Sequence, residues 1–142
     1  MSEGAPFNPS LYIADTGTAK GRGVFAARAF KADDVVEMCP VVIIKSHTDT
    51  MPPEVRTLVF DWKVLANMPG CNALALGFGS LYNHSNPANM RYQADPSGQN
   101  LHFIAVRDIA AGEELTVNYD AFGGGPEWHN NNWFDRMGIN PV

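Results

Sequence analysis

Apolar residues along this chain fall in short runs, and clusters of glycine, proline, asparagine and aspartate separate the runs. Several runs are rich in β-branched residues and only a few residues long, which is typical of strands. The pattern predicts strands at Leu11–Ile13, Val24–Ala27, Val35–Ile44, the start of Ala73–Asn89, Met90–Ala94, Leu101–Val106 and Leu115–Tyr119. Pro40 lacks an N–H, so within Val35–Ile44 it predicts a bulge or a sheet edge.

The polar clusters between these runs predict loops and turns. They fall at Gly17–Gly23, Lys31–Asp34, Ser46–Pro53, Asn67–Asn72, Asp95–Asn100 and Ile109–Gly112. One segment departs from the strand pattern, because apolar residues recur there at helical spacing and predict an amphipathic helix after Pro53. These residues are Val55, Leu58, Val59, Trp62 and Leu65.

Many short strands joined by glycine and proline turns indicate a mostly β fold. With 142 residues, of which 45% are hydrophobic, the chain is long enough for one domain with its own core. Residues 1–10 contain Pro6 and Pro9 and predict a flexible lead-in. No apolar run approaches the ~20 residues that span a bilayer, and the N-terminus lacks the pattern of a secretory signal. We therefore expect a soluble intracellular protein without a membrane partner.

Fifteen acidic residues outnumber ten basic ones, and the net charge is −5. An acidic surface disfavours direct binding of nucleic acid and favours docking of a basic partner such as a lysine-rich peptide. Cys39 and Cys71 lie far apart without a C-x-x-C motif, which argues against a cysteine-built zinc site. We interpret both as small buried hydrophobic residues.

Three polar motifs follow one another between the predicted strands. They are Lys20-Gly21-Arg22-Gly23, Asn83-His84-Ser85, and Gly112-Glu113-Glu114-Leu115-Thr116 with Tyr119 shortly after. Taken singly, the first two are also compatible with ordinary turns. In this order, however, the set resembles the SET-domain protein-lysine methyltransferases, and the resemblance extends from about Lys20 to about Trp133.

This resemblance implies a SET-type β-clip fold, built of several small curled sheets with a knot-like threaded C-terminal segment. It divides the chain into the lead-in at 1–10, a SET domain at 11–122, and an aromatic C-terminal segment at 123–142. That last segment resembles a post-SET region without its Cys-rich zinc site. The resemblance also offers an alternative for the segment after Pro53, which would be a variable insert containing a short strand at Leu58–Trp62.

The activity implied by the resemblance is transfer of a methyl group from S-adenosyl-L-methionine to a lysine ε-amine, with S-adenosyl-L-homocysteine as the product. The implied cofactor-binding residues are Lys20, Gly21, Arg22, Gly23, Asn83, His84 and Tyr119. Trp128, which follows the glycine run Gly123–Gly125, is a further candidate that could stack on the adenine ring. A second Gly-x-Gly, Gly77-Phe78-Gly79, is set aside because the family places this motif near the N-terminus. No other histidine or carboxylate stands at ligand spacing from His84, so we expect no metal.

Tyr119 matches the family's tyrosine at the point of methyl transfer and is the predicted catalytic residue. A phenol with an ordinary pKa of about 10 is a poor general base at neutral pH. We therefore assign Tyr119 to alignment of the amine and to electrostatic stabilisation. The alternative for a tyrosine at a strand end is core packing.

A lysine channel is predicted from four residues, namely Tyr92, Val117, Trp133 and Phe134. The first two stand where family members restrict the number of methyl groups accepted, although cross-strand packing explains Tyr92 equally well. The aromatic pair near the C-terminus could wall the channel and contact a lysine through cation–π interactions, or could seal the domain end.

The resemblance leaves two classes of function open. One is an active methyltransferase whose substrate is a lysine in a basic protein or peptide, histone or otherwise. The other is a catalytically inactive SET-like module that binds a peptide or partner. In either case we expect the protein in the cytoplasm of a bacterium, or in the nucleus or cytoplasm of a eukaryotic cell. The small core is also compatible with a homodimer.

Overall fold

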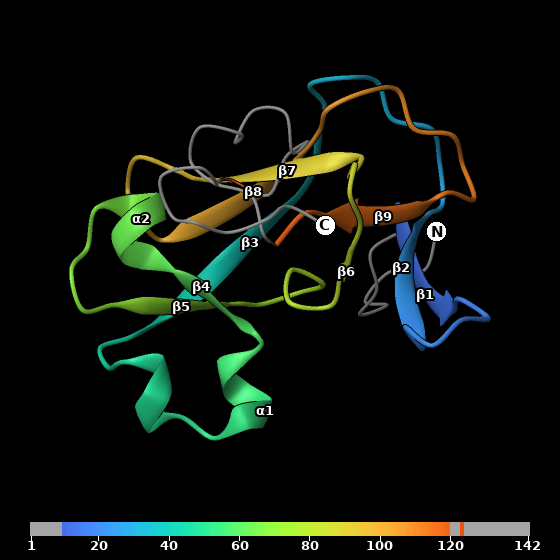
Figure 1. The fold of residues 1–142 in the computed structure, drawn as a ribbon. Coiled ribbons are helices and arrows are strands. Elements are labelled where there is room, and N and C mark those ends of the chain that lie inside the picture. The colour runs from blue at the N-terminus through green and yellow to red at the C-terminus, as the bar shows by residue number, and fades with distance from the viewer. Residues whose placement is uncertain (1–9, 120–122, 124–142) are drawn as a thin grey trace, which may run out of the picture.

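A computed structural model describes residues 10–119 and Gly123, and it contains two sheets (Figure 1). The smaller sheet has the strand order β1 (Leu11–Asp15), β2 (Arg22–Ala26), β9 (Glu114–Val117), β6 (Asn83–His84). The larger has the order β4 (Val59–Asp61), β5 (Asn72–Ala75), β3 (Val35–Ile44), β8 (Asn100–Ala105), β7 (Met90–Ala94). The mostly β architecture expected from the short apolar runs is confirmed.

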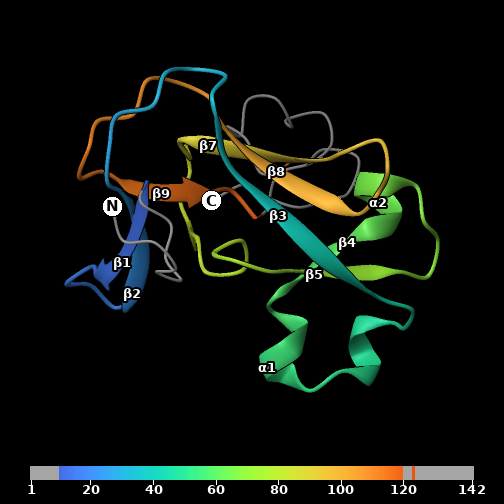
Figure 2. The same cartoon turned by 180° about the vertical axis from the view of Figure 1, so that it is seen from behind.

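The described residues form three short helices between β3 and β5. They are the 3₁₀ helix η1 (Thr48–Thr50) and the α-helices α1 (Pro53–Arg56) and α2 (Trp62–Ala66). The β1–β2 hairpin lies at one end of the molecule and α2 at the other, in both views (Figures 1 and 2). None of these helices is long and apolar enough to cross a membrane.

The small sheet is built on the β1–β2 hairpin, whose register pairs Leu11 with Ala26. Strand β9 then adds antiparallel to β2, with Val24 opposite Leu115. All four of these side chains are buried. Because side chains alternate between the two faces of a strand, this register places one face of the hairpin in the core.

Strand β6 was not expected, since the Asn-His-Ser cluster indicated a turn. It is two residues long and pairs in parallel with β9, Asn83 opposite Thr116 and His84 opposite Val117. Buried Asn89 ties the segment after β6 to β9, because its Oδ1 accepts the Thr116 N–H at 2.9 Å.

Strand β3 is the central strand of the large sheet, and it changes partner along its length. Its first half pairs with β8 up to Pro40, and its second half pairs with β5 from Val41. The bulge predicted at Pro40 is not found there, because the irregularity lies between Val35 and Glu37. Pro40 does lie at a local edge, since the pairing of β3 with β5 begins only at Val41. Pro40 is tolerated because its main chain faces the side on which β5 has already ended at Ala75.

The segment after Pro53 combines both interpretations that the sequence allowed. A continuous helix is wrong, because α1 ends at Arg56 and α2 does not begin until Trp62. Between them β4 pairs with β5 and carries the buried Phe60 into the core. Asp61 caps α2 by accepting the Lys63 and Val64 N–H groups, and this cap separates the strand from the helix.

The core lies between the two sheets, and aromatic residues dominate its part nearest to Tyr119. The ring centroids of Phe60 and Tyr92 are 5.0 Å apart, and those of Tyr82 and Phe103 are 4.7 Å apart. Cys39 is buried and Cys71 partly buried against this core, as expected for small hydrophobic residues. Residues 1–9 of the predicted lead-in, all of the C-terminal segment except Gly123, and its threading fall outside the described residues.

Candidate active site

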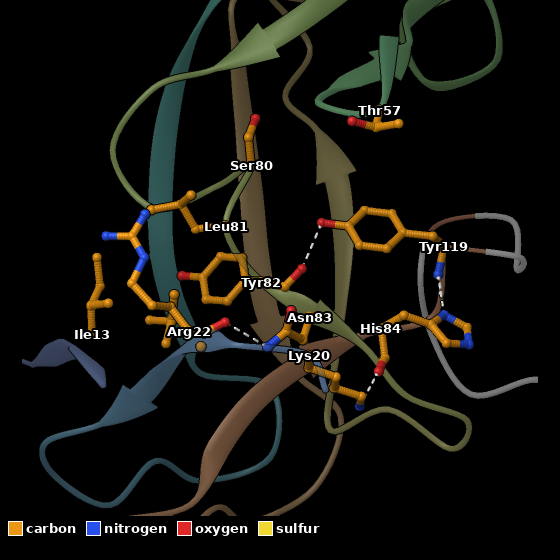
Figure 3. A pocket seen from close by; sticks show the side chains of 12 residues that line it. Ile13, Lys20, Arg22, Thr57, Ser80, Leu81, Tyr82, Asn83, His84 and Tyr119 are labelled. Atoms are coloured by element: carbon orange, nitrogen blue, oxygen red, sulfur yellow. Dashed lines mark hydrogen bonds between the residues drawn. The ribbon is translucent and has the colours of Figure 1, made fainter. Parts of the chain in front are cut away.

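A cavity of about 390 Å³ opens between the small sheet and the loop that leads into β6 (Figure 3). Its walls come from the hairpin, from the turn after α1, from 80–84 and from the end of β9. The lining residues are Ile13, Lys20, Arg22, Gly23, Val24, Thr57, Ser80, Leu81, Tyr82, Asn83, His84 and Tyr119. The cavity therefore contains residues from all three sequence motifs or their immediate neighbours.

The parallel pairing of β6 with β9 creates this proximity. Strand β9 lies between β2, which carries the Gly-x-Gly motif, and β6, which is the Asn-His pair. Tyr119 follows β9 by two residues and so emerges beside His84. A short strand at the centre of the site fixes both main chains by hydrogen bonds, which is a more rigid support than a loop.

Asn83 connects the first and third motifs through its side-chain amide. Its Nδ2 donates to the Arg22 carbonyl oxygen at 2.9 Å and to the Glu114 carboxylate at 2.7 Å. Gly23 lies against this pair, since a Cβ added there would overlap Glu114 Oε2 and lie 3.0 Å from Asn83 Nδ2. The second glycine of the motif is thus explained by the close approach of two polar side chains, and its φ is not in the left-handed region.

His84 is held from both sides. Its carbonyl oxygen accepts the Lys20 ammonium at 2.6 Å, and its ring Nδ1 accepts the Tyr119 main-chain N–H at 3.2 Å. An Nδ1 that accepts carries no proton, so the neutral ring holds its proton on Nε2. The Lys20 side chain thereby bridges to a residue that follows it by 64 positions.

The Tyr119 hydroxyl donates to the Tyr82 carbonyl oxygen at 3.0 Å, as Figure 3 shows. The ring packs against Phe60 and Tyr92, with centroids 6.0 and 6.4 Å away. Although 41% of the residue is exposed, its hydroxyl points inward, and desolvation raises the pKa of this phenol above its ordinary value. Tyr119 therefore stays protonated at neutral pH, which favours a hydrogen-bonding role over proton abstraction.

Most of the predicted cofactor-binding residues converge on the cavity. Lys20, Arg22, Gly23, Asn83, His84 and Tyr119 line it. Gly21 is one residue removed, in the turn that precedes β2, where its φ of +76° is readily adopted by glycine. Trp128 lies outside the described residues.

The two predicted channel residues that the structure describes, Tyr92 and Val117, do not line this cavity. Val117 is fully buried in β9. Tyr92 lies behind the Tyr119 ring and borders a second cavity of about 490 Å³, together with Leu65, Ala94 and Gly123. Trp133 and Phe134 lie outside the described residues, so the channel remains a prediction.

Sequence reasoning missed several residues that shape the site. The sequence pattern placed Glu114 in the third motif without a role of its own, whereas its carboxylate accepts a hydrogen bond from the Asn83 amide. Tyr82 contributes to the site through its main-chain carbonyl, for which a sequence carries no signal. Thr57 and Ser80 reach the cavity because the Ser80 hydroxyl donates to the Leu58 carbonyl oxygen at 2.9 Å and draws the two loops together.

A model of the SET domain matches residues 21–120, which include all three motifs except Lys20 at the start of the first. This chain belongs to the SET-domain family of protein-lysine methyltransferases. The matched range lies within the predicted domain at 11–122, and the resemblance of the ordered motifs is confirmed.

Individual SET proteins agree with this assignment. A Schizosaccharomyces pombe histone-lysine N-methyltransferase, specific for H3 lysine-37, is 30% identical over 112 residues, which are 77% of this chain and 72% of that protein. The fold also matches a candidate histone methyltransferase of Plasmodium falciparum, with a TM-score of 0.63, 24% identity, and coverage of 80% of this chain and 95% of that chain. A structure of ctPRC2 with H3K27me3 and H3K27M matches with a TM-score of 0.61 and 22% identity, over 77% of this chain and 14% of that chain.

Proposed function

We propose that this SET domain is an active S-adenosyl-L-methionine-dependent protein-lysine N-methyltransferase. The observation that carries the proposal is the double anchoring of Tyr119, whose N–H donates to His84 Nδ1 and whose hydroxyl donates to the Tyr82 carbonyl oxygen. This arrangement holds one phenol at the edge of a cavity formed by the three family motifs. In an inactive relative, we would expect at least one of these anchors to be missing.

The residues of the cavity fit the cofactor. Its volume of about 390 Å³ lies within the range of about 300–1,000 Å³ typical of ligand pockets. Lys20 and Arg22 bring two positive charges to one wall, which suits the carboxylate of a methionine moiety. Asn83 and His84 present the polar edges that would hold the remaining amino-acid and adenine portions, and Trp128 is our candidate for stacking on the adenine.

When bound, the cofactor supplies an electrophilic methyl group on its sulfonium. The protein's task is to orient the neutral lysine amine toward this group and to exclude water. The Tyr119 hydroxyl donates to the Tyr82 carbonyl oxygen, so its own oxygen is turned to accept an N–H from the amine. Because burial raises the pKa of Tyr119, the residue keeps its proton, and the proton of the amine would pass to water.

The substrate we propose is a lysine in a basic protein or peptide, with histones or histone-like proteins as the first candidates. The net charge of −5 supports a basic partner. So does the S. pombe relative, whose substrate is a lysine of histone H3.

Two measurements test this function in sequence. Isothermal titration with S-adenosyl-L-homocysteine should show binding, and absence of both heat and a thermal shift would exclude the enzyme. Reaction with labelled S-adenosyl-L-methionine and an array of lysine peptides, followed by mass spectrometry, should then identify a methylated lysine. Cofactor binding without methylation of any peptide or basic protein would favour the inactive binding module.

A further inference from the structure

The second Gly-x-Gly of the chain, Gly77-Phe78-Gly79, packs directly over β3. A Cβ added at Gly77 would lie 2.5 Å from Glu37 Oε2, and one added at Gly79 would lie 2.9 Å from Cys39 Sγ. Gly77 also has a φ of +70°, which other residues rarely adopt. Both glycines are therefore needed for this loop to approach the side chains of β3.

The close approach allows one carboxylate to bind both ends of the loop. Glu37 Oε2 accepts the Phe78 main-chain N–H at 2.9 Å, and Oε1 accepts the Tyr82 hydroxyl at 2.6 Å. Hydrogen bonds to a carboxylate are shorter and stronger than those between neutral groups. Burial, followed by the charge of Glu37, raises the pKa of Tyr82 well above its ordinary value, so the phenol remains a donor to this carboxylate.

Tyr82 carries this contact to the reacting residue. Its ring is buried against Phe103, its hydroxyl is anchored on Glu37, and its carbonyl oxygen accepts the Tyr119 hydroxyl. In Figure 3 the Tyr82 hydroxyl and carbonyl lie at opposite ends of the residue, with only the carbonyl toward Tyr119. A shift of the Tyr82 ring would move the acceptor that sets the direction of the Tyr119 O–H bond.

We propose that Glu37 is a positioning residue for methyl transfer, which acts through Tyr82 by fixing the carbonyl oxygen that orients the Tyr119 hydroxyl. This role rests on the proposed function. Glu37 lines neither the cavity at the three motifs nor the one bordered by Tyr92, so its role would be exerted through Tyr82. Glu37 connects the loop at 77–82 to β3, the central strand of the large sheet. The second Gly-x-Gly serves this connection rather than cofactor binding.

The test variant is Glu37→Gln, which keeps the shape of the side chain but replaces one acceptor oxygen by an N–H donor. If the glutamine oxygen keeps the Phe78 N–H, an NH2 group faces Tyr82, so the Tyr82 hydroxyl loses its acceptor and its charge-assisted bond is replaced at best by a weaker neutral one in the reverse direction. The matched control is Glu113→Gln, since Glu113 also accepts a main-chain N–H, from Ala110, and a side-chain donor, from Arg107. Glu113 lies outside the cavity lining, so its loss should lower stability without changing the chemical step.

For each variant, kcat and KM are measured with a peptide that the wild-type protein methylates. The Kd of S-adenosyl-L-homocysteine is measured by titration. We expect Glu37→Gln to lower kcat at least about tenfold, with KM and Kd within about threefold of wild type. Tyr82→Phe should act in the same direction, and the double variant should be no slower than the slower single variant, because both break the same connection. If Glu37→Gln does not fold by circular dichroism, the Tyr82→Phe values decide.

An unchanged kcat, a Kd that worsens in parallel with kcat, or additive losses in the double variant would overturn the positioning role. A drop of kcat in Glu113→Gln equal to that in Glu37→Gln would also overturn it, since general destabilisation would then suffice. These results require an active wild type. Absence of wild-type turnover on all substrates would instead overturn the proposed function, and the positioning role with it.

Discussion

The main-chain N–H of Tyr119 donates to Nδ1 of His84, so the residue that ends the third motif fixes the ring of the second. The contact spans 35 positions of sequence and depends on the parallel pairing of β6 with β9. It also sets the tautomer of His84, whose Nε2 must carry the proton when the ring is neutral. The Asn-His pair and the tyrosine therefore form one unit rather than two adjacent features.

Substitution of Tyr119 by phenylalanine tests the role of its hydroxyl. Tyr119→Phe removes the donor to the Tyr82 carbonyl oxygen and the acceptor for the amine, but keeps the ring packed on Phe60. We expect kcat to fall by about 10²-fold or more, which is the loss typical of removing one positioned polar group from a reacting centre. The Kd of S-adenosyl-L-homocysteine should change less than about threefold. Tyr12→Phe, on the exposed face of β1, is the control. Equal losses in kcat and cofactor affinity would contradict the alignment role.

Gly23 tests the connection between Asn83 and Glu114. In Gly23→Ala the new Cβ would overlap the end of the Glu114 side chain, which must move and release the Asn83 amide. Because that end is flexible and φ is ordinary, we expect little loss of stability, whereas cofactor affinity should fall at least about tenfold, or about 1.4 kcal/mol. Titration calorimetry and thermal unfolding measure the two effects.

Gly112→Ala is the control for Gly23→Ala, and it should lower stability without lowering cofactor affinity. Its φ is +90° and a Cβ there would meet nothing within 4 Å, so only backbone strain is added. The variant should lose about 1 kcal/mol of stability and bind the cofactor product as well as wild type. Loss of cofactor affinity in this variant, or normal affinity in Gly23→Ala, would contradict the prediction.

Trp62 tests the connection between α2 and the turn before β8. Its side chain is fully buried, and its indole N–H donates to the Gly98 carbonyl oxygen at 2.9 Å. Trp62→Phe leaves that carbonyl without its donor and opens a small void, so we expect unfolding to become easier by about 1–3 kcal/mol. Urea denaturation measures the change, and Val64→Ala on the exposed side of α2 should stay within about 0.5 kcal/mol. A loss no larger than that of the control would show that the indole contact contributes nothing.

Tyr82 gives a prediction at alkaline pH. Unfolded tyrosine loses its proton near pH 10, whereas in the folded protein burial and Glu37 raise the pKa of Tyr82 well above 10. Above pH 10 the unfolded state therefore binds fewer protons than the folded state, and stability falls as pH rises. Tyr82 should contribute up to about 1.4 kcal/mol per pH unit to this fall.

The measurement compares wild type with Tyr82→Phe by urea denaturation between pH 8 and pH 11. The variant is expected to lose stability less steeply than wild type above pH 10, while the two curves run parallel below pH 9. Parallel curves over the whole range would mean that the Tyr82 phenol ionises in the folded protein as easily as in the unfolded chain.

Local sequence was sufficient to predict most strands and the family. Runs such as Met90–Ala94 and Leu101–Val106 alternate or concentrate apolar residues in a way that reports directly on burial. The helical spacing after Pro53 was misleading because two of its members, Val59 and Trp62, belong to different elements. The Asp61 cap between them, a local signal, was not recognised.

What the sequence by itself determined was most of the strands, the order of the three motifs and the motif residues that line the cavity. The tertiary structure alone decided how they meet, namely the two-residue parallel strand at Asn83–His84, the Lys20 ammonium on the His84 carbonyl, and Glu37 beneath the loop that carries Tyr82. The reason is physical. Burial patterns depend on nearest neighbours in the chain, whereas main-chain carbonyls and pairings between distant segments take their partners from the fold and leave no periodic trace in the residues themselves.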